Sequence, residues 1–134
     1  MTGQASGEQR GLLDTSVVIA QDVVPIPGVL AISAVTLAEL HLGVLVATSA
    51  ELRAERLRRL SILQHRFDAL PLDEVVAASY GRLAAAVVEA GRQPRRRVMD
   101  LLIAATAHAH GAVLWTRNPD DFSGLEDFIE VKVP

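Results

Sequence analysis

Short hydrophobic runs alternate along this chain with longer stretches in which hydrophobic side chains recur at helical spacing. The short runs predict strands at residues 11–14, 29–33, 112–116 and 129–133, with a brief extended piece at 69–72. The longer stretches predict helices at residues 34–46, 50–67, 74–90 and 98–110. Because strands that are joined by helices usually pair in parallel, the pattern predicts an α/β fold with helices on both faces of a central sheet.

Residues with strong positional preferences mark the ends of these elements. Asp73 is a predicted helix N-cap, and Gly91 and Gly111 stand where helices end. Turns or loops are predicted directly after Asp14 and at residues 25–28, 93–97 and 117–121. Residues 1–10 predict a flexible N-terminal lead-in without a secretory signal, and residues 11–134 predict a single domain.

The composition excludes several classes of function. The 134 residues are 50% hydrophobic, which is enough for the core of one domain. The sequence contains no cysteine, which excludes disulfides, thiol catalysis and cysteine-bound zinc. No hydrophobic run reaches the ~20 residues of a membrane span, and a cytoplasmic protein without a membrane partner is therefore expected.

Three acids occupy positions that are compatible either with a functional site or with a purely structural role. Asp14 follows a buried strand, where α/β proteins place their ligand crevice, but it is equally suited to cap the next helix. Glu39 lies between hydrophobic residues of a helix and is otherwise a surface glutamate. Asp100 opens the most hydrophobic helix, where it either belongs to a site or only stabilises the helix N-terminus, by ~0.3–1 kcal/mol.

A second acidic group, Asn118, Asp120 and Asp121, follows the strand at 112–116 and either joins the same site or only forms a turn. Carboxylates that meet without a cation repel one another and raise one another's pKa values. Mg²⁺, or Mn²⁺ as a substitute, relieves that repulsion and activates water for attack on a phosphodiester. The four histidines are too scattered to indicate zinc, and no glycine-rich phosphate loop is present.

The net charge of −3 is unevenly distributed, because ten of the 13 basic residues lie between residues 53 and 97, with only five acids. A polynucleotide backbone is therefore a candidate ligand for the arginines beside the acids, which are Arg95, Arg96, Arg97 and Arg117. The arginines of the helix at 50–67 either extend this basic surface or form a solvated face with glutamates one turn away; they are Arg53, Arg56, Arg58 and Arg59.

Four motifs in order carry a family resemblance: residues 12–16 (LLDTS), 32–40 (ISAVTLAEL), 100–107 (DLLIAATA) and 114–122 (LWTRNPDDF). The series resembles the PIN-domain ribonucleases, and most closely the toxin component of VapBC toxin–antitoxin modules. The resemblance implies a three-layer α/β/α sandwich with a short, mostly parallel sheet. It also implies a Mg²⁺- or Mn²⁺-dependent endoribonuclease that cleaves structured RNA, either tRNA or ribosomal RNA.

The resemblance also implies roles for individual residues. Asp14 and Asp100 match the main metal ligands of the family, and Glu39 matches a ligand of a second metal or of its water shell. Asn118 stands where many relatives carry an acid, whereas Asp121 matches the acid of the Asp-Phe pair in toxin-type members. The hydroxyls of Thr15 and Thr116 are placed to orient the ligands.

The partners implied by the resemblance are an RNA substrate, a VapB-type antitoxin and a second copy of the chain. The homodimer would form a heterotetramer or larger assembly with the antitoxin, whose C-terminal segment lies in the toxin groove. The alternative function is a non-catalytic module whose acidic pocket binds a cation or a basic partner. A phosphoacceptor domain is less favoured, since the only lysine is Lys132 and the expected adjacent acid pair is absent.

Overall fold

The central sheet is five-stranded and entirely parallel in the computed structural model, which describes residues 8–20 and 25–134. The strand order is β3-β2-β1-β4-β5. The strands are β1 (Arg10–Leu13), β2 (Val29–Ser33), β3 (Asp68–Leu70), β4 (Val113–Trp115) and β5 (Val131–Lys132). The predicted α/β fold with a parallel sheet is confirmed.

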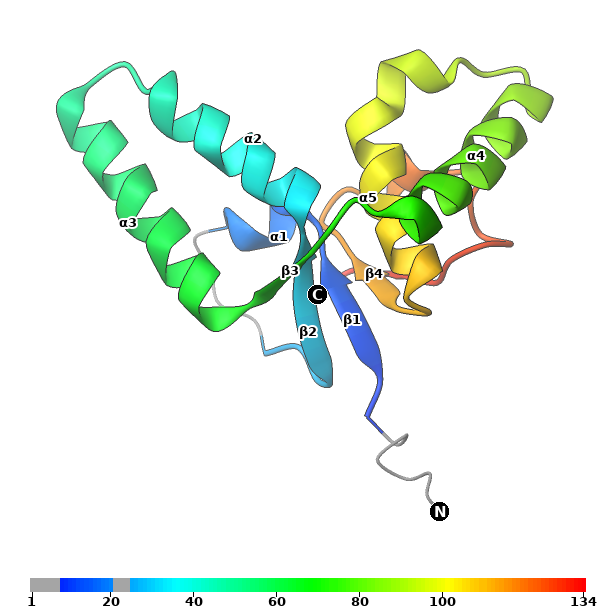
Figure 1. Ribbon diagram of the computed structural model, residues 1–134, viewed down its shortest axis with the longest axis horizontal. Coiled ribbons are helices and arrows are strands. Elements are labelled where there is room, and N and C mark those ends of the chain that lie inside the picture. The colour runs from blue at the N-terminus through cyan, green and yellow to red at the C-terminus, as the bar shows by residue number, and fades with distance from the viewer. Residues whose placement is uncertain (1–7, 21–24) are drawn as a thin grey trace.

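Two helical hairpins flank the strands, one on each side in Figure 1. The first consists of α2 (Ala34–Leu45) and α3 (Ala50–Arg66), and the second of α4 (Glu74–Glu89) and α5 (Val98–Ala109). A one-turn helix, α1 (Thr15–Val18), follows β1. Two short 3₁₀ helices, η2 (Pro94–Arg97) and η3 (Pro119–Phe122), precede α5 and follow β4. None of the helices in the described residues is long and hydrophobic enough to cross a membrane.

The four long helices match their predicted ranges, each ending one residue before its predicted end. Local sequence determines these boundaries. The Asp73 side chain accepts a hydrogen bond from the backbone N–H of Val76 (3.1 Å) and caps α4 as predicted. Gly91 adopts a positive φ of 78° after α4, the left-handed conformation that glycine reaches most readily.

Several predictions at the ends of elements were wrong. The turn predicted after Asp14 is the helix α1, because the Asp14 carbonyl accepts the N–H of Val18 (3.4 Å) and the Thr15 carbonyl accepts the N–H of Ile19 (3.1 Å). The segments at 93–97 and 117–121 contain η2 and η3. The strand predicted at 129–133 shrinks to β5, because Ile129 is held in a turn by its bond to Leu125 (3.1 Å). Strand β1 starts at Arg10, inside the predicted lead-in, of which residues 1–7 lie outside the described part of the chain.

Alternate residues of the central strands pack on opposite faces of the sheet. Leu12 and Leu114 are paired across β1 and β4 and belong to the larger core, which α4 and α5 cover. Leu13 and Trp115, the next pair, belong to a second cluster on the other face. A Cβ atom on Gly11 would lie 2.9 Å from the Trp115 indole nitrogen, so a side chain at that position would collide with the ring.

The direction of the chain reverses at β1 and thereby creates a crevice. From β1 the chain first builds β2 and β3 on one side and later returns to build β4 and β5 on the other. In open α/β sheets, ligands bind outside the carboxyl ends of the strands at such a switch point. The residues that directly follow β1 and β4, Asp14 and Thr116, lie at this position.

Candidate active site

Asp14 is fixed at the switch point by hydroxyl groups. It is 5% exposed, and its Oδ2 accepts hydrogen bonds from Ser16 (2.9 Å) and Thr116 (2.8 Å). Although Asp14 precedes α1, its side chain makes no capping hydrogen bond to the helix. The capping interpretation was therefore wrong, and the carboxylate is instead held in one orientation across the gap between β1 and β4.

The two hydroxyls belong to a small network that joins the ends of both strands. Ser16 Oγ accepts the backbone N–H of Arg117 (3.0 Å), and Thr116 Oγ1 accepts the backbone N–H of Asn118 (3.0 Å). Thr116 was predicted to orient a ligand, and it contacts Asp14. Ser16 was missed in that role, although its place two residues after the aspartate is a common spacing for such a local bond.

Glu39 reaches the same edge of the sheet from α2. The Thr15 hydroxyl donates to Glu39 Oε1 (2.6 Å) and lies 3.0 Å from the Thr36 hydroxyl, which is fully buried. Glu39 itself is half-buried and hydrogen-bonded, so it is not a freely solvated surface glutamate. Sequence reasoning named Thr15 but not Thr36. The available signal was the spacing of Thr36 and Glu39, three residues apart on one face of a helix.

Asp100 lies in the first turn of α5 and is the electrostatic centre of the site. Burial and then the negative charges of Asp121, Asp14 and Glu39 raise the pKa of Asp100 to about 6, while Arg97 opposes the shift. The three acids that were predicted to share its site therefore act on it electrostatically. The repulsion predicted for carboxylates that meet without a cation is present.

Asp121 is the residue of the second acidic group that acts on Asp100. Of the three polar residues around η3, only Asp121 contributes to the raised pKa of Asp100, and its effect ranks ahead of those of Asp14 and Glu39. Asp120 instead offers its backbone carbonyl to Arg97 Nη2 (3.0 Å). Asn118 contributes its backbone N–H to Thr116, which supports the network around Asp14.

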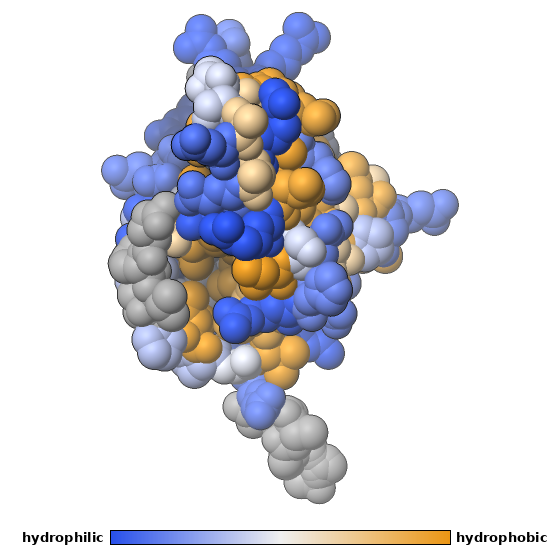
Figure 2. Space-filling view, turned by 90° about the vertical axis from the view of Figure 1, so that its left-hand side faces the viewer, coloured by the Kyte–Doolittle hydropathy of each residue, from blue (hydrophilic) through white to orange (hydrophobic). Residues whose placement is uncertain are grey.

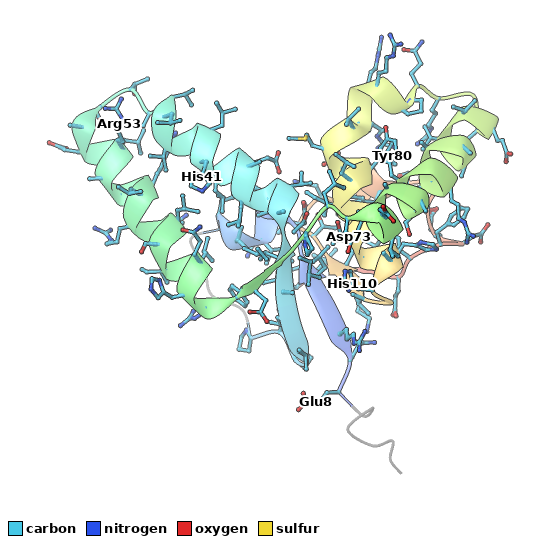
Figure 3. The ribbon with its side chains drawn as sticks, viewed as in Figure 1. Glu8, His41, Arg53, Asp73, Tyr80 and His110 are labelled. Atoms are coloured by element: carbon cyan, nitrogen blue, oxygen red, sulfur yellow. The ribbon has the colours of Figure 1, made fainter. Side chains whose placement is uncertain are left out.

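The donor set fits a hard divalent cation that keeps part of its water shell. Within the described residues, no three His, Asp or Glu side chains lie close enough to enclose a metal ion on their own. Mg²⁺ needs no such cage, because it binds one or two carboxylates directly and retains several waters. Nitrogen ligands for zinc are not gathered here, since His41 lies on α2 and His110 follows α5, well apart in Figure 3.

The arginines divide into two groups. Arg97 turns toward the acids through its bond to Asp120 and its effect on Asp100. Arg95 and Arg96 are exposed on η2, and Arg117 is exposed after β4.

Three arginines of α3 instead donate to backbone carbonyls of the first hairpin and α1; they are Arg53 to Ala47, Arg56 to Gly43 and Arg59 to Ile19. Among the described residues they form no ion pair with the glutamates of their own helix. The glutamate pairing is therefore replaced by packing contacts at these three arginines, and the extension of the basic surface stays a prediction.

A groove of about 450 Å³ leads away from Glu39 between α1, α2 and α3. Ile19, Leu40 and Leu52 supply its hydrophobic lining, and Arg56 and Arg59 its basic one. Figure 2 faces this side of the molecule and shows hydrophobic residues exposed among hydrophilic ones. The groove therefore joins a hydrophobic surface to the acidic edge of the sheet.

Known proteins resemble the chain over nearly its whole length. The family model described as PIN domain matches residues 11–127. Ribonuclease VapC5 of Mycobacterium tuberculosis is 39% identical over 129 residues, which cover 92% of this chain and 93% of the relative. Ribonuclease VapC8 of the same organism is 40% identical over 101 residues, which cover 72% of this chain and 89% of the relative. A chain of the crystal structure of VapBC-5, a toxin–antitoxin system of that organism, superimposes with a TM-score of 0.79 at 40% identity, covering 92% of this chain and 96% of that chain.

Proposed function

The chain belongs to the PIN domain family, and on this premise we propose that it is a metal-dependent endoribonuclease, the toxin of a VapBC-type toxin–antitoxin pair. The observation that carries the proposal is that Asp14, fixed at the switch point of the sheet, acts together with Glu39 and Asp121 on the carboxyl of Asp100. The similarity to proteins named ribonuclease VapC supports it independently. The substrate class that we propose is structured RNA, tRNA or ribosomal RNA.

The residues divide the work of phosphodiester hydrolysis among themselves. A bound Mg²⁺ or Mn²⁺ supplies charge stabilisation at the phosphate and a water of lowered pKa. Asp14 and Asp100 would hold the ion, and the hydroxyls of Ser16 and Thr116 hold the Asp14 carboxylate in one orientation.

Two further acids complete the edge of the sheet. Glu39, oriented by its bond from Thr15 (2.6 Å), and Asp121, on η3, would accept hydrogen bonds from water in the shell of the ion. Positive charge beside this edge comes from Arg97, which contacts Asp120. The arrangement can therefore bind a phosphate, orient a water and screen the developing negative charge.

The groove that starts at Glu39 supports the proposal of a protein partner. Its hydrophobic lining and the carboxylates of Glu39 and Glu55 suit a segment with hydrophobic residues and a positively charged one, as a VapB-type antitoxin would offer. VapBC-5, which contains a chain similar to this one, is a toxin–antitoxin system. We propose that the chain forms a homodimer and that the antitoxin inhibits it through this groove, in a heterotetramer or a larger assembly.

The proposal is tested by incubating the purified chain with bacterial tRNA or ribosomal RNA in Mg²⁺, in Mn²⁺ and in EDTA. Cleavage is expected with either metal and not in EDTA. Asp14→Asn and Asp100→Asn should each lower the cleavage rate at least about 100-fold, because each removes a charge that the ion needs. Asp127→Asn is the control, because Asp127 is an exposed acid that does not act on Asp100.

Two results would contradict the proposal. Cleavage that persists in EDTA would exclude a metal-dependent reaction. Metal binding by calorimetry with no cleavage of any RNA by the wild-type chain would favour the non-catalytic binding module instead.

A further inference from the structure

A second basic feature lies outside the carboxylate edge, between the two helices of the second hairpin. We propose that the pocket lined by Gly91, Arg92, Gln93, Arg96 and Arg97 binds a backbone phosphate of the RNA substrate away from the cleaved bond. The pocket is open, with a volume of about 540 Å³. The inference rests on the proposed ribonuclease function and adds a positioning site to it.

The backbone of this pocket is fixed at both ends. At the end of α4, the N–H of Gly91 bonds to the Val88 carbonyl (2.9 Å) and the N–H of Arg92 bonds to the Val87 carbonyl (3.0 Å). This pair of bonds is a Schellman motif, which sets the direction in which the chain leaves the helix. The next residues wind into η2 and lead directly into α5. The arginines therefore project from a fixed backbone, which lowers the entropic cost of binding a ligand.

Two of the arginines attach the pocket to the catalytic edge. Arg97 Nη2 donates to the Asp120 carbonyl (3.0 Å), and Arg92 Nη1 donates to the Ser123 carbonyl (3.4 Å). Both carbonyls belong to the η3 turn, which also carries Asp121. A guanidinium group has five N–H donors, so a single carbonyl contact leaves donors for a phosphate. An RNA strand lying across the acids would therefore meet Arg97 and then the pocket.

The arginines of the pocket, Arg92, Arg96 and Arg97, form no ion pairs within the part of the protein that the structure describes, although Arg97 also acts on the charge of Asp100. Arg96 also makes no side-chain hydrogen bond within the described ranges 8–20 and 25–134. The planar guanidinium group matches the oxygens of a phosphate with two parallel hydrogen bonds, which favours a phosphate as the ligand.

The lining favours RNA over an acidic protein segment. It contains no hydrophobic and no aromatic side chain. Protein interfaces depend on a few buried hydrophobic or aromatic anchors, for which this pocket has no place. Contacts to an RNA backbone need only charge and hydrogen-bond donors. The groove beside Glu39, by contrast, has the hydrophobic lining that a protein partner needs.

The experiment measures binding of fluorescently labelled tRNA by anisotropy, in EDTA and over a range of salt concentrations. Arg92→Gln and Arg96→Gln should each lower the affinity severalfold and reduce the slope of log K against log salt by about 1. Arg82→Gln is the matched control, because it removes the same charge from an exposed position on α4 outside the pocket. Arg96→Gln breaks no hydrogen bond within the described residues, so its effect reports the loss of charge even if Arg92→Gln loosens the η3 turn.

The inference is overturned if the salt slopes of the Arg92 and Arg96 variants equal that of Arg82→Gln, or if the wild-type chain binds no tRNA. It is also overturned if the variants keep tRNA binding but lose binding of poly-L-glutamate, which would assign the pocket to an acidic protein. Cleavage is not part of this assay. If the chain binds tRNA with the expected salt dependence but cleaves no RNA, the proposed function is contradicted. The proposed phosphate pocket is not.

Discussion

The carboxylates at the end of β1 and at the start of α5 are held in opposite ways. Asp14, 5% exposed, receives two hydroxyl hydrogen bonds on one oxygen. Asp100 receives no side-chain hydrogen bond from any described residue and is surrounded by three other acids, so its pKa rises to about 6. One carboxylate is therefore oriented before any ligand arrives, whereas the other carries a repulsion that a cation would relieve.

The activity of the site should therefore depend on a different property at each of these two carboxylates. The end of β1 depends on geometry and should fail when hydroxyls are removed. The start of α5 depends on charge and should respond to pH and to metal. Variants that affect only one half can separate these dependences.

Among variants that leave all four carboxylates in place, the largest effect is expected from removing the two hydroxyls that hold Asp14. The double variant Ser16→Ala with Thr116→Val should lower RNA cleavage about 10- to 100-fold, because hydrogen bonds to a metal ligand have effects of that order. Single-turnover cleavage of tRNA in Mg²⁺ measures the effect. Thr106→Val is the control, since Thr106 is a buried threonine of α5 that bonds only to the Leu102 carbonyl (2.8 Å). If the double variant cleaves tRNA as fast as the control and the wild type, the orientation of Asp14 by hydroxyls does not contribute to cleavage.

A smaller effect is expected at Glu39. Thr15→Val removes the 2.6 Å bond to Glu39 Oε1 and should slow cleavage by about tenfold, at the lower end of the range for such contacts. Thr36→Val leaves the bond from Thr15 to Glu39 in place and should have a weaker effect. The same cleavage assay ranks the two variants. The reverse order would mean that Thr36, and not Thr15, controls the position of Glu39.

The smallest effect concerns stability at the start of α5. Folding raises the pKa of Asp100 from 3.8 to about 6, so the proton is bound more tightly in the folded chain and the ionised form is disfavoured there. The stability linked to this proton is present below pH 4 and is lost as the pH rises through about 6.

Asp100→Asn should therefore raise Tm by a few degrees at pH 7 in EDTA, with the gain shrinking toward pH 4. Thermal melts of this variant and of Asp127→Asn, which should match the wild type, measure the difference. A lower Tm at pH 7 would show that the Asp100 charge stabilises the fold.

The sequence predicted best what depends on neighbours along the chain. The ends of α4 follow from Asp73 and Gly91, whose bonds are local. The contact of Thr116 with Asp14 and the effect of Asp121 on Asp100 depend on tertiary structure. The Thr116 hydroxyl reaches Asp14 across 102 residues through the pairing of β1 with β4. The choice of Asp121 over Asn118 and Asp120 follows from the direction of the η3 turn, which the motif alone left open. Arg92 was not predicted, because the Schellman motif and its contact with Ser123 become visible only in the folded chain.

The most direct measurement is an NMR titration of the Asp100 side-chain carboxyl, with and without Mg²⁺. Without metal, its pKa should be about 6, because the carboxylates around it repel its charge. Saturating Mg²⁺ should lower this pKa by more than one unit, since a cation held by Asp14 and Asp100 favours the ionised form. A pKa near 3.8 without metal, or a raised pKa that Mg²⁺ leaves unchanged, would contradict a cation site built from these four acids.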